Sequence, residues 1–270
     1  MRNSDKNALT RERTEIKYLL SPGKAKIIKE LAEEKVGSHT YTEGRFITFI
    51  TTIYLDTEDR SFYRHALENP GDHVKLRARE YYYFNEELIE LSSSWDSLFE
   101  YRPVIWLELK ERKKQSTFKH RIKVPKNVLV PMLAGSECRS ELIDVNDNVP
   151  EFDTAYEILS SYLSERNGKP LVPSSVVNYR RRSFEDGHET LRITLDAGLN
   201  FHRAKNDLLK MKKPMVKENL GSALSSLKDI VLEIKTRSGI PAWLKSATGG
   251  IDPVDFSKFR ESSRLALESD

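Results

Sequence analysis

The sequence predicts an α+β fold in which a large antiparallel sheet or barrel carries helices on its outside. Segments with strand composition follow one another with few helices between them, and strands this close in sequence pair mostly antiparallel. In most of these segments charged and apolar residues alternate with the two-residue period of a strand. We therefore expect one face of the sheet to be charged and the other to be apolar.

The first half of the chain begins with a polar stretch, residues 1–12, which we expect to be flexible. An alternating strand at 13–20 comes next, and the Ser-Pro pair that follows it marks the start of a helix at 21–35. β-branched and aromatic residues predict a strand at 46–57. The other strands expected in this half are 73–84, 104–112 and 117–124.

The second half alternates between helices and strands. Apolar residues at helical spacing predict helices at 126–134, 152–165 and 255–268. Strands are expected at 175–184, 189–196 and 229–237. Residues 85–102 and 203–228 show no clear periodicity, and no composition shift divides the chain. We therefore expect a single domain over residues 13–268.

The composition restricts the class of protein. The 270 residues carry 44 basic and 41 acidic side chains, a net charge of +3. A nucleic-acid binder is disfavoured by this near balance and by the lack of basic residues interleaved with stacking aromatics. A single cysteine excludes an internal disulfide. No signal peptide or apolar run of membrane-spanning length is present, so we expect a cytoplasmic protein without a membrane segment of its own.

The charged face of the predicted sheet is dominated by Arg and Lys. An ordinary antiparallel sheet with one wet face also alternates, but usually with mixed polar residues. Like charges on neighbouring strands repel, so something anionic should compensate them. An eight-stranded barrel is wide enough inside for a small ligand, and charged faces turned inward would form a basic tunnel. The alternation assigns to this face Lys75, Arg77, Arg79, Glu108, Lys110, Arg112, Lys119, Arg121, Lys123, Arg192, Asp196, Glu233 and Lys235.

A Glu-x-Lys motif with an apolar middle residue occurs on three of these strands, at 15–17, 108–110 and 233–235. Both charged residues of each motif lie on the same strand face. A carboxylate in a basic tunnel could hold Mg²⁺ or Mn²⁺, which take carboxylate oxygens together with substrate phosphates. The alternative is an ion pair with neighbouring bases, which we favour for two of the three motifs.

Common nucleotide and catalytic motifs are absent from the sequence. It contains no GxxxxGK[ST], no GxGxxG, no HExxH and no GxSxG. Any phosphate would therefore be bound by side chains and not by a glycine-rich loop.

Nine short motifs occur in an order that resembles a known family. They are RTEIKY, IYLDT, KLRAR, LELK, KHRI, YRRRSF, LRITLD, VLEIK and DFSKF, and the resemblance covers roughly residues 13–265. Their order and wording resemble the VTC domain, the polyphosphate polymerase module of the vacuolar transporter chaperone family within the triphosphate tunnel superfamily. The resemblance implies a β-barrel tunnel, Mn²⁺ or Mg²⁺ as cofactor, and transfer of the terminal phosphoryl group of ATP to inorganic polyphosphate.

The resemblance also implies roles for particular residues. The catalytic candidates are Lys17, Arg77, Arg79, Lys110, Lys119, Arg181, Arg192 and Lys258. The substrate-binding candidates are Lys75, Arg121, Lys235 and Tyr179. The metal-binding candidates are Glu233, with Glu15 or Glu108 as helpers.

Two departures from the family pattern bear on function. The first strand reads RTEIK where the tunnel triphosphatases carry ExExK, which favours the polymerase branch. The SPX module and membrane segments of the fungal subunits are not expected here, so a membrane-bound partner and the oligomeric state stay open. A triphosphatase of the same fold and a non-catalytic polyphosphate-binding module remain the alternatives.

Overall fold

The computed structural model describes residues 14–84, 98–114, 116–164, 170–188, 190–205 and 207–269; the expected flexible segment 1–12 lies outside them. One antiparallel sheet of nine strands dominates this part of the chain, in the order β1-β9-β7-β6-β2-β3-β4-β5, with β8 paired to β7. The strands are β1 (Thr14–Leu20), β2 (Ile47–Asp56), β3 (Asp72–Phe84), β4 (Val104–Lys113), β5 (Ser116–Pro125), β6 (Val172–Glu185), β7 (Leu191–Arg203), β8 (Ala223–Leu227) and β9 (Ile230–Thr236).

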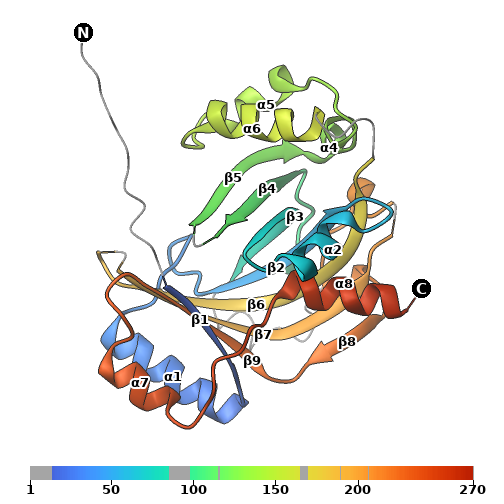
Figure 1. Ribbon diagram of the computed structural model, residues 1–270. Coiled ribbons are helices and arrows are strands. Elements are labelled where there is room, and N and C mark those ends of the chain that lie inside the picture. The colour runs from blue at the N-terminus through green and yellow to red at the C-terminus, as the bar shows by residue number, and fades with distance from the viewer. Residues whose placement is uncertain are drawn as a thin grey trace.

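The helices pack around this curved sheet (Figure 1). They are α1 (Pro22–Lys35), α2 (Ser61–Glu68), α4 (Lys126–Leu133), α5 (Arg139–Asn146), α6 (Phe152–Ser164), α7 (Ala242–Thr248) and α8 (Lys258–Glu268). The predicted α+β class and antiparallel sheet are confirmed. Helix α5 and strand β8 were not predicted, and β7 extends seven residues beyond the predicted end at 196.

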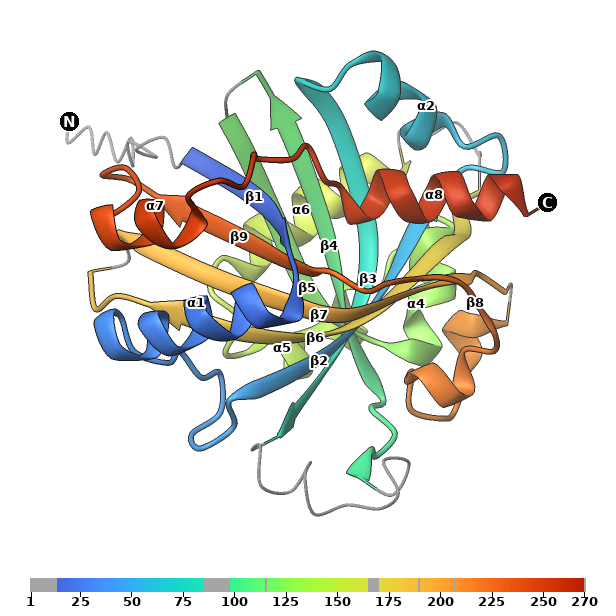
Figure 2. The ribbon, with the colours of Figure 1, turned by 90° about the horizontal axis from the view of Figure 1, so that it is seen from below.

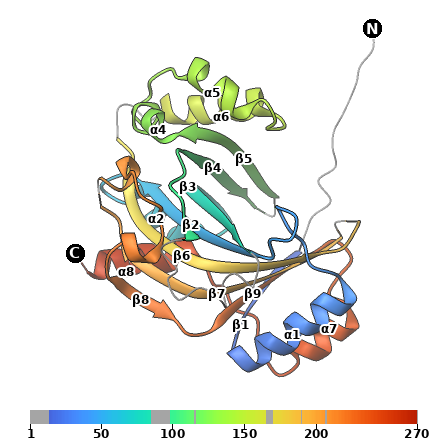
Figure 3. The same cartoon turned by 180° about the vertical axis from the view of Figure 1, so that it is seen from behind.

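Two apolar clusters bind helices to the outside of the sheet. Helices α4, α5 and α6 cover β4 and β5, while α1 and α7 cover the opposite wing (Figures 1 and 3). The first cluster includes Leu107, Leu109, Ile122, Leu129 and Leu159, all buried. The second cluster includes Ile28, Ala32, Ile193, Leu232 and Ile234, also buried. Both clusters use the apolar members of the alternating strands, so the charged members face the concave side, as predicted.

The antiparallel sheet is confirmed, but its closure into a barrel is not shown. Strands β1 and β5 are the two ends of the hydrogen-bonded order, and no pairing joins them in the described part of the chain. The segment 249–257 instead runs beside β1 on its way from α7 to α8 (Figure 2). Its Val254 N–H donates to the Lys17 carbonyl at 2.9 Å. This segment therefore occupies part of the β1 edge that a closing strand would need.

Helix α8 begins at the concave side, and its first turn reaches the charged face. The Ser257 hydroxyl caps this helix by accepting from the Arg260 N–H at 3.4 Å. The same hydroxyl accepts from the Lys75 ammonium of β3, also at 3.4 Å. The cap thus places Lys258, the first helical residue, against the sheet. Among the described residues no helix is long and apolar enough to cross a membrane.

Candidate functional site

The strand register brings the predicted bases into contact distance of one another. On β3 and β4, Lys75 lies opposite Lys110 and Arg77 lies opposite Glu108. On β4 and β5, Lys110 lies opposite Lys119. Three lysines therefore form a row across three neighbouring strands, an arrangement that is destabilising unless an anion compensates it.

Glu108 is the centre of the first charged cluster. Its side chain is fully buried. Arg77 donates a hydrogen bond to one of its oxygens through Nε at 2.8 Å, and Nη2 forms an ion pair with the same oxygen at 2.7 Å. Arg79 lies 3.5 Å from the same oxygen, and Lys119 lies 3.1 Å from the other. Burial raises the pKa of Glu108, but the three cations together hold it well below the ordinary value. The carboxylate is thus ionised and surrounded by cations, which fits an anchor for the bases better than a metal ligand.

Asp196 of β7 is the centre of a second cluster. Arg181 of β6 donates one hydrogen bond to each carboxylate oxygen of Asp196, through Nε at 2.6 Å and Nη2 at 2.7 Å. The Lys258 ammonium also donates to this carboxylate, at 2.6 Å. Burial raises the pKa of Asp196, and the two cations more than reverse this effect, so the carboxylate is ionised. Both cations also stand over the ring of Tyr179, at 5.6 and 4.9 Å from its centroid. The buried hydroxyl of Tyr179 has no hydrogen-bond partner in the described part of the chain.

Glu15 and Glu233 form a third cluster on the paired strands β1 and β9. Lys17 lies 2.9 Å from Glu15 and 3.9 Å from Glu233, while Lys235 lies 3.5 and 3.1 Å from the same two carboxylates. Burial raises the pKa of Glu233, but its lysine and arginine neighbours hold it well below the ordinary value. No group of three or more His, Cys, Asp or Glu side chains in the described ranges could hold a metal by itself. Two carboxylates fit Mg²⁺ or Mn²⁺ only if phosphate and water complete the shell, which is the common arrangement for Mg²⁺.

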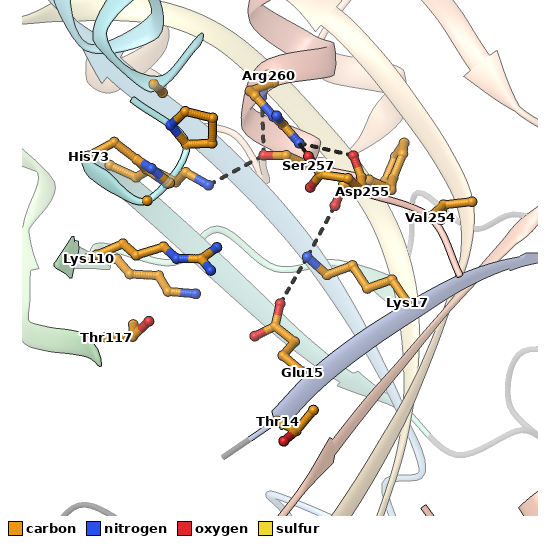
Figure 4. Close-up of a pocket in the computed structure, with 16 residues that line it drawn as sticks. Thr14, Glu15, Lys17, His73, Lys110, Thr117, Val254, Asp255, Ser257 and Arg260 are labelled. Carbon is orange, nitrogen blue, oxygen red and sulfur yellow. Dashed lines mark hydrogen bonds and ion pairs between the residues drawn. The ribbon is translucent and has the colours of Figure 1, made fainter. Parts of the chain in front are cut away.

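A cavity of about 610 Å³ opens between the two edges of the sheet (Figure 4). Bases dominate its charged lining, and we call it the lysine mouth. Burial and neighbouring cations lower the pKa of Lys75 to about 7. Burial lowers the pKa of Lys110 to about 8. The charged side chains that line the lysine mouth are Glu15, Lys17, Lys75, Lys110, Arg112, Asp255 and Arg260.

A family model for the VTC domain matches residues 12–267, nearly the whole chain. The chain belongs to the VTC domain family. A search of curated proteins found no match. One similar solved structure is HpAC1 from Hippeastrum, an adenylyl cyclase candidate described as having a dominant triphosphatase activity. It is 12% identical with a TM-score of 0.49, and the match covers 93% of this chain and 94% of that chain. An adenylate cyclase candidate from Bacillus halodurans matches with 14% identity and a TM-score of 0.45, covering 92% and 98%.

Two predicted residues of this VTC domain lie apart from these clusters. Arg121 stacks over the ring of Trp106, 4.6 Å from its centroid. Arg192 binds the hydroxyl of Tyr41 and lies 3.9 Å from Glu185. Both face other side chains and not the lining of the lysine mouth.

Three charged residues of this candidate site were not among the site residues predicted from the sequence. Asp196 belongs to the alternating set of its strand, and that alternation was the available signal for a concave-face carboxylate. Arg112 carried the same signal on β4. Arg260 carried no such signal, because only the start of α8 against the sheet brings it to the lysine mouth.

Proposed function

We propose that this protein is a metal-dependent polyphosphate polymerase, which transfers the terminal phosphoryl group of ATP to an inorganic polyphosphate chain. One observation carries the proposal. Lys75 and Lys110 are half-buried, face the lysine mouth, and have no carboxylate within ion-pair distance among the described residues. Ammonium groups buried without a counter-ion are costly unless a ligand supplies the negative charge. A phosphate chain is an anion of suitable charge and shape.

The arginines are suited to hold the transferred group. Phosphoryl transfer depends on positioning and on charges that are already in place when charge develops. Glu108 orients Arg77 through one hydrogen bond and an ion pair, and Asp196 orients Arg181 through two hydrogen bonds. Guanidinium donors that remain can bind phosphate oxygens in a fork.

The chemistry of the acceptor favours transfer over hydrolysis. A terminal phosphate is already ionised near neutral pH, so it needs no general base. The histidine that lines the lysine mouth, His73, has its pKa lowered to about 4, chiefly by burial, and is a weak base. A hydrolase would gain from a base that orients water, and this residue is poorly suited to that role.

Glu233 and Glu15 are the residues that would hold Mg²⁺ or Mn²⁺. A bound divalent cation would neutralise charge on the phosphates. Lys17 and Lys235 hold both carboxylates ionised and oriented. The carboxylate of Glu108 is already surrounded by bases, so we assign it no metal.

Product analysis tests this function. The purified protein is incubated with ATP and Mn²⁺, polyphosphate is resolved on a gel, and free orthophosphate is assayed in parallel. A ladder of chains together with ADP is the expected result. Orthophosphate without chains would instead assign a triphosphatase. Tight polyphosphate binding without either product would indicate a non-catalytic module.

A further inference from the structure

A second cavity, of about 550 Å³, lies at the other end of β3. Lys75 lines the lysine mouth, whereas Tyr81 and Tyr83 line this second cavity, six to eight residues further along the strand. At about 3.3 Å per residue the two ends are roughly 20–26 Å apart. Figure 2 shows β3 leading from α2 toward the opposite side of the molecule. We call the second cavity the tyrosine mouth. The side chains that line it include Arg45, Arg79, Tyr81, Tyr83, Arg102 and Trp106.

The two tyrosines present parallel rings to this cavity. The rings of Tyr81 and Tyr83 lie at 3° to each other, with centroids 6.4 Å apart, and both residues are half-buried. Tyr82, between them, faces the other side of the sheet and packs in a separate apolar cluster with Phe99. The ring of Trp106 already has Arg121 over it at 4.6 Å. The ring of Tyr83 has the ring of Tyr41 beside it, with centroids 6.2 Å apart at 42°. Tyr81 and Tyr83 are the tyrosines that line the tyrosine mouth.

The tyrosine mouth connects directly to the phosphate-binding bases. Arg79 donates to the hydroxyl of Tyr81 at 3.4 Å, and that hydroxyl donates to Glu108 at 3.3 Å. Along β3, a side chain two residues away on the same face is roughly 7 Å distant. A phosphate held by Arg79 would thus lie next to the tyrosine rings. A nucleoside triphosphate has an aromatic ring at one end of its phosphates, whereas an inorganic chain has none.

We propose that the tyrosine mouth binds the base of the nucleoside triphosphate by stacking on Tyr81 and Tyr83. The proposal rests on the proposed function for its substrate class. The phosphates then point along β3 toward the lysine mouth, whose charged lining suits an inorganic chain. Stacking accepts any base, because every base has a π face, so we expect weak preference among nucleotides.

Binding measurements test the base site without turnover. Calorimetry in EDTA compares ATP with inorganic tripolyphosphate for the native protein, Tyr83→Leu and Tyr83→Phe. Loss of one stacking ring should weaken ATP binding about tenfold and leave tripolyphosphate within about twofold. The phenylalanine variant keeps the ring and should resemble the native protein. Arg77→Met, next to Arg79 on the same face of β3, is the matched control and should weaken both ligands alike.

The outcomes separate the two proposals. Equal effects of Tyr83→Leu on both ligands, or no effect on either, would overturn the base site while leaving the phosphate tunnel intact. Binding of neither ligand by the native protein would overturn both proposals. A melting curve for each variant shows whether it is folded.

Discussion

The guanidinium of Arg77 lies against a single oxygen of Glu108, to which its Nε donates a hydrogen bond at 2.8 Å and its Nη2 forms an ion pair at 2.7 Å. The other oxygen of that carboxylate is 3.1 Å from Lys119. One fully buried carboxylate therefore orients bases from β3 and β5 toward the concave face. Of the three Glu-x-Lys motifs, this one is an internal counter-ion, whereas the other two form the shared cluster of Glu15 and Glu233.

Glu108→Gln should destabilise the fold without changing metal dependence. The substitution leaves buried cations without their counter-ion, which typically costs about 3–5 kcal/mol of unfolding free energy. Urea denaturation measures the loss. The Mn²⁺ concentration for half-maximal activity should stay as in the native protein. A shift in that concentration would show that Glu108 binds the metal after all.

Glu233→Gln should give the opposite pattern. The amide is a weaker metal ligand than the carboxylate, and we expect metal-dependent transfer to fall at least about 100-fold, the scale for removing a key electrostatic group. Stability should change less than in Glu108→Gln, because Glu15 still pairs with both lysines. Product gels over a Mn²⁺ titration measure the effect. Activity at native Mn²⁺ levels would contradict the metal assignment.

Arg181→Lys should reduce turnover roughly tenfold or more while the protein stays folded. Lysine keeps the charge beside Asp196 but cannot reproduce the two-pronged contact. Turnover and KM for ATP are the measured quantities. Arg64→Lys, on the exposed part of α2, serves as a matched control and should be neutral. Equal turnover in the two variants would remove Arg181 from the site.

The lysine mouth should make phosphate binding depend on pH. Lys75, with a pKa of about 7, and Lys110, with a pKa of about 8, lose their protons as pH rises through this range. Affinity for tripolyphosphate should therefore fall between about pH 6.5 and pH 8.5. Calorimetry at several pH values measures it, and Lys75→Arg should flatten the profile because arginine stays charged. A flat native profile would mean that these lysines do not hold the anion.

The free energy of unfolding of the ligand-free protein should rise with pH, whereas the affinity for tripolyphosphate falls. Unfolded lysine keeps its proton up to about pH 10.5, so between pH 7 and that value the unfolded chain binds more protons than the folded one. Stability contributed by this difference is therefore lost as pH falls toward 7 and gained as pH rises. Thermal melting from pH 7 to pH 9, with Lys75→Met as control, checks the sign. A native melting temperature that falls over this range as it does in the variant would contradict the lowered pKa.

The concave face could be predicted because alternation is a local property of each strand. Lys75, Arg77 and Glu108 lie on that face because every second side chain of a strand points to the same side. Their pairing could not be predicted, because it depends on the register between β3 and β4. The cover on the β1 edge could not be predicted for a similar reason: that edge is bound by Val254, more than 200 residues away. Arg260 was missed because helix placement, not strand pattern, brings it to the lysine mouth.

The pairing of β1 with β9 has a consequence for the order in which the chain folds during synthesis. Lys17 lies opposite Glu233, so the metal-binding candidates meet across more than 200 residues of sequence. Contacts this remote in sequence form late, since a long loop must close first. During synthesis, β1 therefore leaves the ribosome well before β9, and the edge that pairs with β9 stays unpaired until β9 has been made. Folding of this wing would therefore bring Glu15 and Glu233, the metal-binding candidates, together in one late step.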